Sequence, residues 1–353
     1  MKVFFNDGYV APGHGADTTR KSGEIAAALA TGRVPTVELA DPVDLVDQVE
    51  QLVPTVHSEA YVNALKTGRP TELAESQGFG WDEGIWEMAA NSTAGVLAAT
   101  NEALAIGGPS GSLSSGLHHA RRANGAGYCT VNGLAVAANH ATEQVDGTVV
   151  VLDVDAHCGG GTNELIGDNQ RILHLDLSTN GFDHYQPKGN DKLLVLGSRT
   201  DEAYLDHVDW CLDRVPKDSS LVIYNAGMDP HPSISAEGLA ERERRVANWC
   251  ANHAMPVAWV LAGGYTWSIS MDQLVDLHLH TSPRSRPPSR TGCHRPFLAF
   301  APKPRTRSLP TTATPATTTS PEMSPRHELL QRLSTQRRRQ DAARLQRRRQ
   351  HRT

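Results

Sequence analysis

Two acidic residues and a histidine follow an apolar run in the stretch VVVLDVDAHCGGGT, residues 149–162. The run 149–152 predicts a strand that is buried on both faces, as in a parallel sheet. Charged groups at the end of such a strand are costly to bury unless they are paired or bind a metal. The alternation of Asp153, Asp155 and His157 therefore predicts a cation site at this strand end.

Polar residues follow two further predicted strands, and a fourth polar cluster lies just before a loop. In open α/β sheets, ligands bind beyond the carboxyl ends of the strands. The segment IYNAGMD ends at Asp229, LAGGYTW contains Tyr265, and GLHHA supplies His118 and His119. Taken singly, each has an ordinary explanation as a helix cap or a turn. Taken together, they favour one common site where ligands bind in such a sheet.

The residue types at these strand ends are those of a metal-dependent hydrolase. Asp155, His157 and Asp229 suffice to hold a zinc ion, because a catalytic zinc has three protein ligands and one open position. Zinc makes water a usable nucleophile near neutral pH and polarises a carbonyl. The paired histidines could move the proton of that water to a leaving amine. The tyrosine hydroxyl could donate to the developing oxyanion, so the set predicts amide hydrolysis.

The predicted elements that position these residues alternate between strand and helix, which indicates a single α/β domain with a parallel sheet. Strands are predicted at 2–5, 148–154, 171–177, 192–197, 220–227 and 256–264. Helices are predicted at 21–30, 43–53, 58–65, 84–104, 133–141, 201–215, 236–254 and 271–281.

Charge and composition divide the chain near residue 282. Residues 282–353 hold 17 Lys and Arg against three acidic residues, a net charge of +14. Because the whole chain carries −5, the first 281 residues carry −19. The acidic body suits cationic substrates and disfavours nucleic acid, although acidity also serves solubility alone. The Pro-, Thr- and Arg-rich segment 282–353 predicts a disordered basic tail, or a frame-shifted terminus. Its arginines are the part of the chain that could contact nucleic acid or an acidic partner.

Cysteine usage and hydropathy predict a cytoplasmic protein with no membrane association. The five cysteines are odd in number and form no CxxC pair, which favours a reducing compartment. Residues 1–15 contain no apolar segment of signal-peptide length, and no 18-residue apolar run follows.

Four segments in this order, GLHHARRANGAGYCTVN, VVVLDVDAHCGGGT, IYNAGMD and LAGGYTW, resemble the zinc-dependent histone deacetylase and acetylpolyamine amidohydrolase family of the arginase/deacetylase superfamily. The resemblance covers nearly all of residues 1–281. It implies the arginase/deacetylase fold, an α/β domain with a parallel sheet of about eight strands flanked by helices on both faces. It also implies a deacetylase catalytic domain over 1–281.

The same resemblance implies a role for each site residue. It implies that Asp155, His157 and Asp229 are zinc ligands. It also implies that His118, His119 and Tyr265 are catalytic groups. Asp153 would orient His118 and, with the backbone carbonyls of Asp155 and His157, hold a structural K⁺. Gly127 and Tyr128 would line the channel that receives the acyl-amine chain.

The sequence departs from the family pattern after His157. Family members usually read DxDxHHGDG or DxDxHHGNG, whereas this chain reads DVDAHCGGG. Cys158 stands for the second histidine and is expected to be buried rather than to contact zinc. Gly160 stands for the Asp or Asn that supports the second catalytic histidine, so activity is expected to fall unless a neighbouring residue or a water substitutes. The loop that usually follows is shortened to NGFDHYQPKGND.

Two other functions remain open on the sequence. An arginase-like ureohydrolase shares the DAH at 155–157 but needs a further Asp where Gly159 stands. A catalytically weak protein that binds an acylated amine would explain the change at Gly160. Within the deacylase interpretation, the substrate is an acetylpolyamine, another small acylated amine or acetyl-lysine in a protein, with the acidic body favouring a small amine.

Overall fold

The computed structural model describes residues 1–13 and 15–281. The predicted basic tail at 282–353 lies outside the described residues, so the prediction of disorder and the proposed domain boundary stay predictions. None of the helices within the described residues combines the length and apolarity needed to cross a bilayer.

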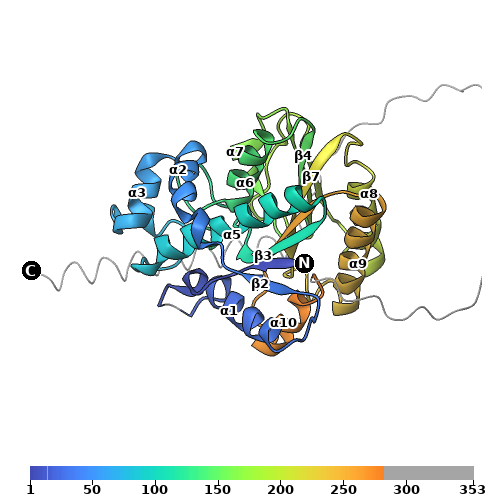
Figure 1. Cartoon of the computed structure of the whole chain (residues 1–353), viewed down its shortest axis with the longest axis horizontal. Coiled ribbons are helices and arrows are strands. Elements are labelled where there is room, and N and C mark those ends of the chain that lie inside the picture. Colours follow the sequence, from blue (N-terminus) through green and yellow to red (C-terminus); the bar gives the residue numbers. More distant parts are fainter. Residues whose placement is uncertain (14, 282–353) are drawn as a thin grey trace, which may run out of the picture. The chain divides into compact units, whose positions relative to one another are not determined.

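Within these residues, eight strands form one sheet in the order β2-β1-β3-β8-β7-β4-β5-β6, and each neighbouring pair is parallel (Figure 1). This confirms the predicted parallel α/β sheet. The strands are β1 (Lys2–Phe4), β2 (Glu38–Ala40), β3 (Pro109–Ser115), β4 (Thr148–Asp153), β5 (Ile172–Ser178), β6 (Lys192–Val195), β7 (Ser219–Gly227) and β8 (Val257–Ala262).

Helices cover both faces of the sheet because successive side chains of each central strand point to opposite faces. In β4, Val150 and Leu152 join one buried apolar cluster, while Val149 and Val151 join another. The first cluster is covered by α1 (Asp17–Ala30), α8 (Asp201–Leu212), α9 (Ala236–Asn252) and α10 (Met271–His278). The second is covered by α5 (Gly84–Ile106), α6 (Gly133–Thr142) and α7 (Gly160–Ile166). The unbroken apolar run of β4 is therefore the signature of a strand buried on both sides.

A third apolar cluster packs α2 (Val46–Val56) and α3 (Glu59–Thr67) against the outer side of α5. The short helices η1 (Asp7–Val10), η2 (Val43–Leu45) and α4 (Thr71–Ala74) complete this part of the chain. His57 follows α2 directly and is fully buried.

The register of the central strands brings their carboxyl ends level. Asp153 of β4 pairs with Asn225 of β7 and with Asp176 of β5, while Gly227 of β7 pairs with Ala262 of β8. The loops that follow β3, β8, β7, β4 and β5 therefore lie side by side at one edge of the sheet. Every polar strand end that the sequence singles out belongs to one of these loops.

The central strand β3 was not predicted, because its sequence PSGSLSS has neither an apolar run nor alternation. Its serines are buried, and the hydroxyls of Ser110, Ser112 and Ser114 are hydrogen-bonded, as in the 3.0 Å contact between Ser112 Oγ and Tyr9 Oη. A Cβ on Gly111 would lie 2.0 Å from the Trp259 ring of β8. Small residues in β3 thus make room for large side chains packed from both sides, and a single sequence does not show this.

Candidate active site

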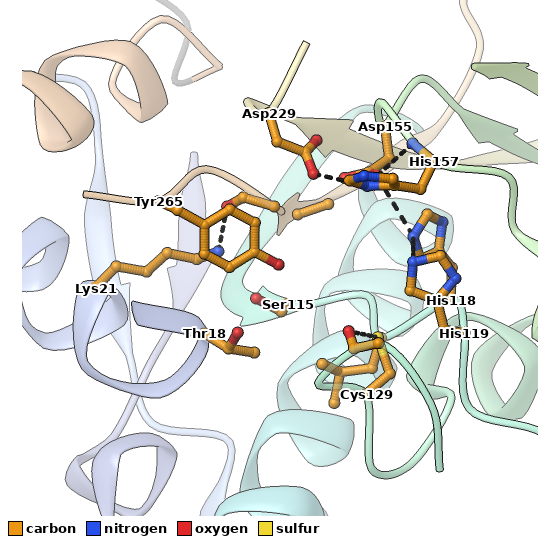
Figure 2. Close-up of a pocket in the computed structure, with 14 residues that line it drawn as sticks. Thr18, Lys21, Ser115, His118, His119, Cys129, Asp155, His157, Asp229 and Tyr265 are labelled. Atoms are coloured by element: carbon orange, nitrogen blue, oxygen red, sulfur yellow. Dashed lines mark hydrogen bonds and ion pairs between the residues drawn. The ribbon is translucent and has the colours of Figure 1, made fainter. Parts of the chain in front are cut away.

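Two carboxylates and an imidazole converge beyond the ends of β4 and β7 (Figure 2). Asp155 and His157 lie two and four residues past the end of β4, and Asp229 lies two residues past the end of β7. His157 Nδ1 is 3.0 Å from Asp229 Oδ2 and 3.3 Å from Asp155 Oδ1. Among the residues that the structure describes, these three form the one group of metal-binding side chains, with ligand atoms within 4.8 Å of one another.

The electrostatics of this group suit a divalent cation. Burial, together with the charge of Asp155, raises the pKa of Asp229 to about 6. Burial lowers the pKa of His157, but hydrogen bonds and charges from the two carboxylates outweigh it and raise that pKa to about 10. The carboxylates thus hold a proton on the imidazole that a metal would displace. Carboxylate oxygens and imidazole nitrogens are both zinc donors, and a catalytic zinc has three protein ligands with one position left open, so these residues fit zinc.

His118 and His119 face each other beside this group. Their Nε2 atoms are 3.1 Å apart, and the Nδ1 atom of each ring contacts a carboxylate. For His118 the partner is Asp153, whose Oδ2 is 2.7 Å from Nδ1. Burial lowers the pKa of His118, but Asp153 and Asp155 more than offset it and raise that pKa to about 10.

Asp153 is fully buried behind the histidine pair and is fixed by several hydrogen bonds. Its Oδ1 accepts from the backbone N–H of Asp155 at 3.1 Å and from Asn225 Nδ2 at 2.9 Å. One carboxylate therefore orients His118 and holds the backbone of a predicted metal ligand.

The partner of His119 is Asp183, which the sequence analysis did not single out. Asp183 Oδ2 lies 2.9 Å from His119 Nδ1, and its Oδ1 accepts from Arg121 Nη2. Burial lowers the pKa of His119, and the charge of His118 lowers it further, against the opposing effect of Asp183. The two histidines therefore differ in protonation near neutral pH, with His118 charged and His119 neutral.

Tyr265 and Lys21 complete the cavity from the opposite side (Figure 2). Burial raises the pKa of the Tyr265 hydroxyl well above its usual range, and Asp229 and Asp155 add to this effect. The Lys21 ammonium is buried and donates to the backbone carbonyl of Gly263, in the turn that carries Tyr265. Burial lowers the pKa of Lys21 to about 8 against the attraction of Asp229 and Asp155. No feature of the sequence distinguished Lys21 from the other residues of α1.

The residues that line this cavity come from six separate stretches of the chain. They are Thr18, Lys21, Ser115, Leu117, His118, His119, Gly127, Cys129, Asp155, His157, Asp229, Ala262, Gly263 and Tyr265.

The predicted channel residues lie next to this cavity. A Cβ on Gly127, whose φ is +52°, would lie 2.4 Å from His119 Cδ2, so glycine permits the close approach of this loop to the imidazole. Tyr128 stacks on Phe79, with ring centroids 6.3 Å apart, and its ring centroid is also 6.3 Å from that of Tyr265. Its part in a substrate channel stays a prediction.

The two departures after His157 have different surroundings. Cys158 is fully buried, as expected, and its Sγ contacts the Asn180 carbonyl at 3.5 Å. A Cβ on Gly160 would lie 2.6 Å from the Asp183 carbonyl oxygen and 2.7 Å from Asp183 Oδ1. The space beside Gly160 is thus occupied by Asp183.

The fold is shared with solved structures of other proteins. The acetylpolyamine aminohydrolase of Burkholderia pseudomallei superposes with a TM-score of 0.62 at 19% identity, over 80% of this chain and 97% of that one. The HD domain of HDA15 superposes with a TM-score of 0.62 at 17% identity, over 80% of this chain and 89% of the other.

A model of the histone deacetylase domain matches residues 19–281, and the chain belongs to this family. It is 28% identical to an uncharacterised protein of Picosynechococcus over 61% of this chain and 75% of that protein. It is likewise 28% identical to histone deacetylase 2 of Arabidopsis thaliana, over 60% of this chain, and to the acetoin utilization protein AcuC of Bacillus subtilis, over 62%. The matched regions span 59% and 65% of these last two proteins, less than two thirds of either. Family membership supports a hydrolase of the deacetylase class.

Proposed function

We propose that this protein is a zinc-dependent amidohydrolase that removes an acyl group, most simply acetyl, from an acylated amine. The observation that carries the proposal is the convergence of the Asp155–His157–Asp229 group, the histidine pair and Tyr265 on one cavity. Zinc held by that group would polarise the substrate carbonyl and acidify a water molecule.

The other residues would handle the proton and the developing charge. His119 is neutral near pH 7 and can accept a proton, whereas His118 is charged and can donate one. Environments that push the pKa values of two neighbouring groups apart are typical of acid–base pairs. Tyr265 keeps its hydroxyl proton at neutral pH, so it can donate a hydrogen bond to an oxyanion from the side opposite the histidines.

A structural K⁺ beside Asp153 is a second part of the proposal. Burial and the neighbouring Asp153 raise the pKa of Asp176 to about 6, so the two strand-end carboxylates repel each other. A monovalent cation held by Asp153 and the backbone carbonyls of Asp155 and His157 would favour the charged form of both.

We expect the substrate to be a small acylated amine, with acetyl-lysine in a protein as the alternative. The charge of −19 over residues 1–281 favours a substrate that carries further positive charge, as an acetylpolyamine does.

The proposal is tested by amine release from acetylputrescine, acetylspermidine and acetyl-lysine peptides. The zinc-loaded full-length chain is compared with the Asp229→Ala variant, which removes one ligand and should lose zinc and turnover together. Turnover by the wild type alone supports a zinc deacylase and ranks its substrates. Zinc binding without turnover on any substrate would favour a protein that binds acylated amines without hydrolysing them.

A further inference from the structure

Asp183 contacts His119 from a part of the chain that is remote in sequence. The two residues are 64 positions apart, and the loop of Asp183 follows β5, whereas Asp153, the partner of His118, ends β4. The Asp183 side chain is only 9% exposed, so its contact with Nδ1 is shielded from water. Each histidine of the pair thus has a buried carboxylate on its Nδ1 atom, drawn from two neighbouring strand ends.

A second charge holds Asp183 in this position. Arg121 Nη2 pairs with Asp183 Oδ1, while Arg121 Nη1 lies 2.8 Å from Glu164 Oε2. The backbone carbonyl of Arg121 accepts from the buried His57 ring, with Nδ1 at 2.8 Å. His119 and Arg121 lower the pKa of Asp183, against burial, so its carboxylate is charged near neutral pH.

Gly160 is the reason that this carboxylate can reach the imidazole. A side chain at position 160 would collide with the backbone and carboxylate of Asp183 and with Arg121 Nη2, which would lie 2.8 Å from its Cβ. Asp183 itself has a φ of +58°, a left-handed conformation that Asp and Asn tolerate better than most residues. The contact of Asp183 with His119 therefore depends both on the absence of a side chain at position 160 and on the left-handed backbone of Asp183.

We infer that Asp183 is the positioning residue of His119, supplied by the loop after β5 in place of a carboxylate at position 160. It fixes the Nδ1–H tautomer of His119, so that Nε2, which faces His118 Nε2 at 3.1 Å, is the nitrogen that can accept a proton. The inference rests on the proposed function, in which His119 acts as the base.

Asp183 follows an aromatic residue that packs on two histidines of the cavity. Phe182, its neighbour, is 50% exposed and packs edge-on against His119 and His157, with centroid distances of 5.0 and 5.7 Å. The loop that packs this aromatic ring against the two histidines thus also carries the carboxylate that contacts His119.

Two substitutions of Asp183 separate its contact with His119 from its role in the loop. Asp183→Gly removes the carboxylate and accepts a positive φ without strain. Asp183→Asn keeps an acceptor and the backbone preference but removes the charge. The matched control is Glu164→Gln, which takes a carboxylate from the same arginine without touching His119.

In the zinc-loaded full-length chain, we expect kcat to fall about a hundredfold in Asp183→Gly and about tenfold in Asp183→Asn, the range of about 10–100-fold that follows loss of the partner of a metal-bound histidine. KM and zinc content should stay within about twofold of the wild type, and Glu164→Gln should change kcat by less than about twofold. Equal losses in Asp183→Gly and Glu164→Gln, or no loss in either, would overturn the inference.

A second readout does not depend on turnover. In ¹⁵N-histidine-labelled protein, the Nδ1–H proton of His119, assigned with a His119→Gln variant, should give a downfield, slowly exchanging resonance. It should be lost in Asp183→Gly and kept in Glu164→Gln. If the wild type shows this pattern but hydrolyses no acylated amine, the positioning role stands and the proposed function fails. If the resonance is missing from the wild type or survives in Asp183→Gly, the positioning role is wrong.

Discussion

Replacing Tyr265 by phenylalanine removes one hydroxyl from the cavity and leaves the surrounding packing in place. The Tyr265 ring stacks on Trp267, with centroids 4.6 Å apart and planes inclined by 10°, and a phenylalanine ring retains this contact. Because the pKa of the hydroxyl lies well above neutral, the wild-type group is a hydrogen-bond donor throughout the working pH range. The substitution therefore tests the donor alone.

The expected loss follows from what such donors contribute. Removing one oxyanion donor lowers kcat by about 10²–10³, which corresponds to about 2.7–4 kcal/mol of transition-state stabilisation. We expect Tyr265→Phe to lose this much kcat while KM changes little and one zinc per chain is retained. The hydroxyl lies opposite the histidine pair, so its loss should leave their carboxylate contacts intact.

Steady-state kinetics with the best acylated amine, together with zinc analysis of the same samples, measures this effect. Tyr61→Phe is the matched control, because it removes a buried hydroxyl that donates to the Thr130 carbonyl at 2.8 Å, outside the cavity. It should lower stability by about 1 kcal/mol and leave kcat unchanged. A Tyr265→Phe variant that keeps more than about a third of the wild-type kcat with zinc bound would refute the donor role.

Three further outcomes are expected. Because the pKa of Lys21 is lowered from 10.5 to about 8, the folded chain binds fewer protons than the unfolded chain between these values. The stability of the metal-free wild type relative to Lys21→Met should therefore rise by about 3 kcal/mol from pH 8 to pH 10.5 in urea unfolding, and a flat difference would contradict the assigned pKa. Zinc binding at pH 7 should release at least one proton, because the metal must displace the proton on His157, whose pKa is about 10. Calorimetry in buffers of different ionisation enthalpy measures this release, and a binding enthalpy independent of buffer would argue against His157 as a ligand. Deleting residues 284–353 should leave kcat and KM unchanged if the basic tail is passive, so an inactive but folded truncation would show that the tail takes part.

Several features of the site could be predicted because they depend on short-range patterns. Asp155 and His157 follow a strand that its apolar run predicts from the sequence, and their spacing places both near one strand end. Asp229 and Tyr265 follow equally apolar strands, so the general rule for parallel sheets brings them to the same edge. The longer helices were predicted for the same reason, as for α5, where the predicted range 84–104 corresponds to Gly84–Ile106, whereas the short helices α4 and α7 were not.

Other features had no signal in a single sequence. The strand β3 is built of serine and glycine, so its burial depends on what packs against it rather than on its own hydropathy. In the sequence, Lys21 does not differ from other residues of its helix. Its contact with the turn that carries Tyr265 appears only in the folded chain.

The sequence by itself determined the class of fold, the family and the residues that can hold a metal, because strand periodicity and motif spacing are local properties. Only the tertiary structure decided what supports those residues. Gly160 in the sequence indicates a missing carboxylate, and Asp183 in the sequence is one acidic residue in a short loop. Their compensation exists only where the loops after β4 and β5 meet, since a contact between His119 and a residue 64 positions away is set by the register of the sheet and not by sequence spacing.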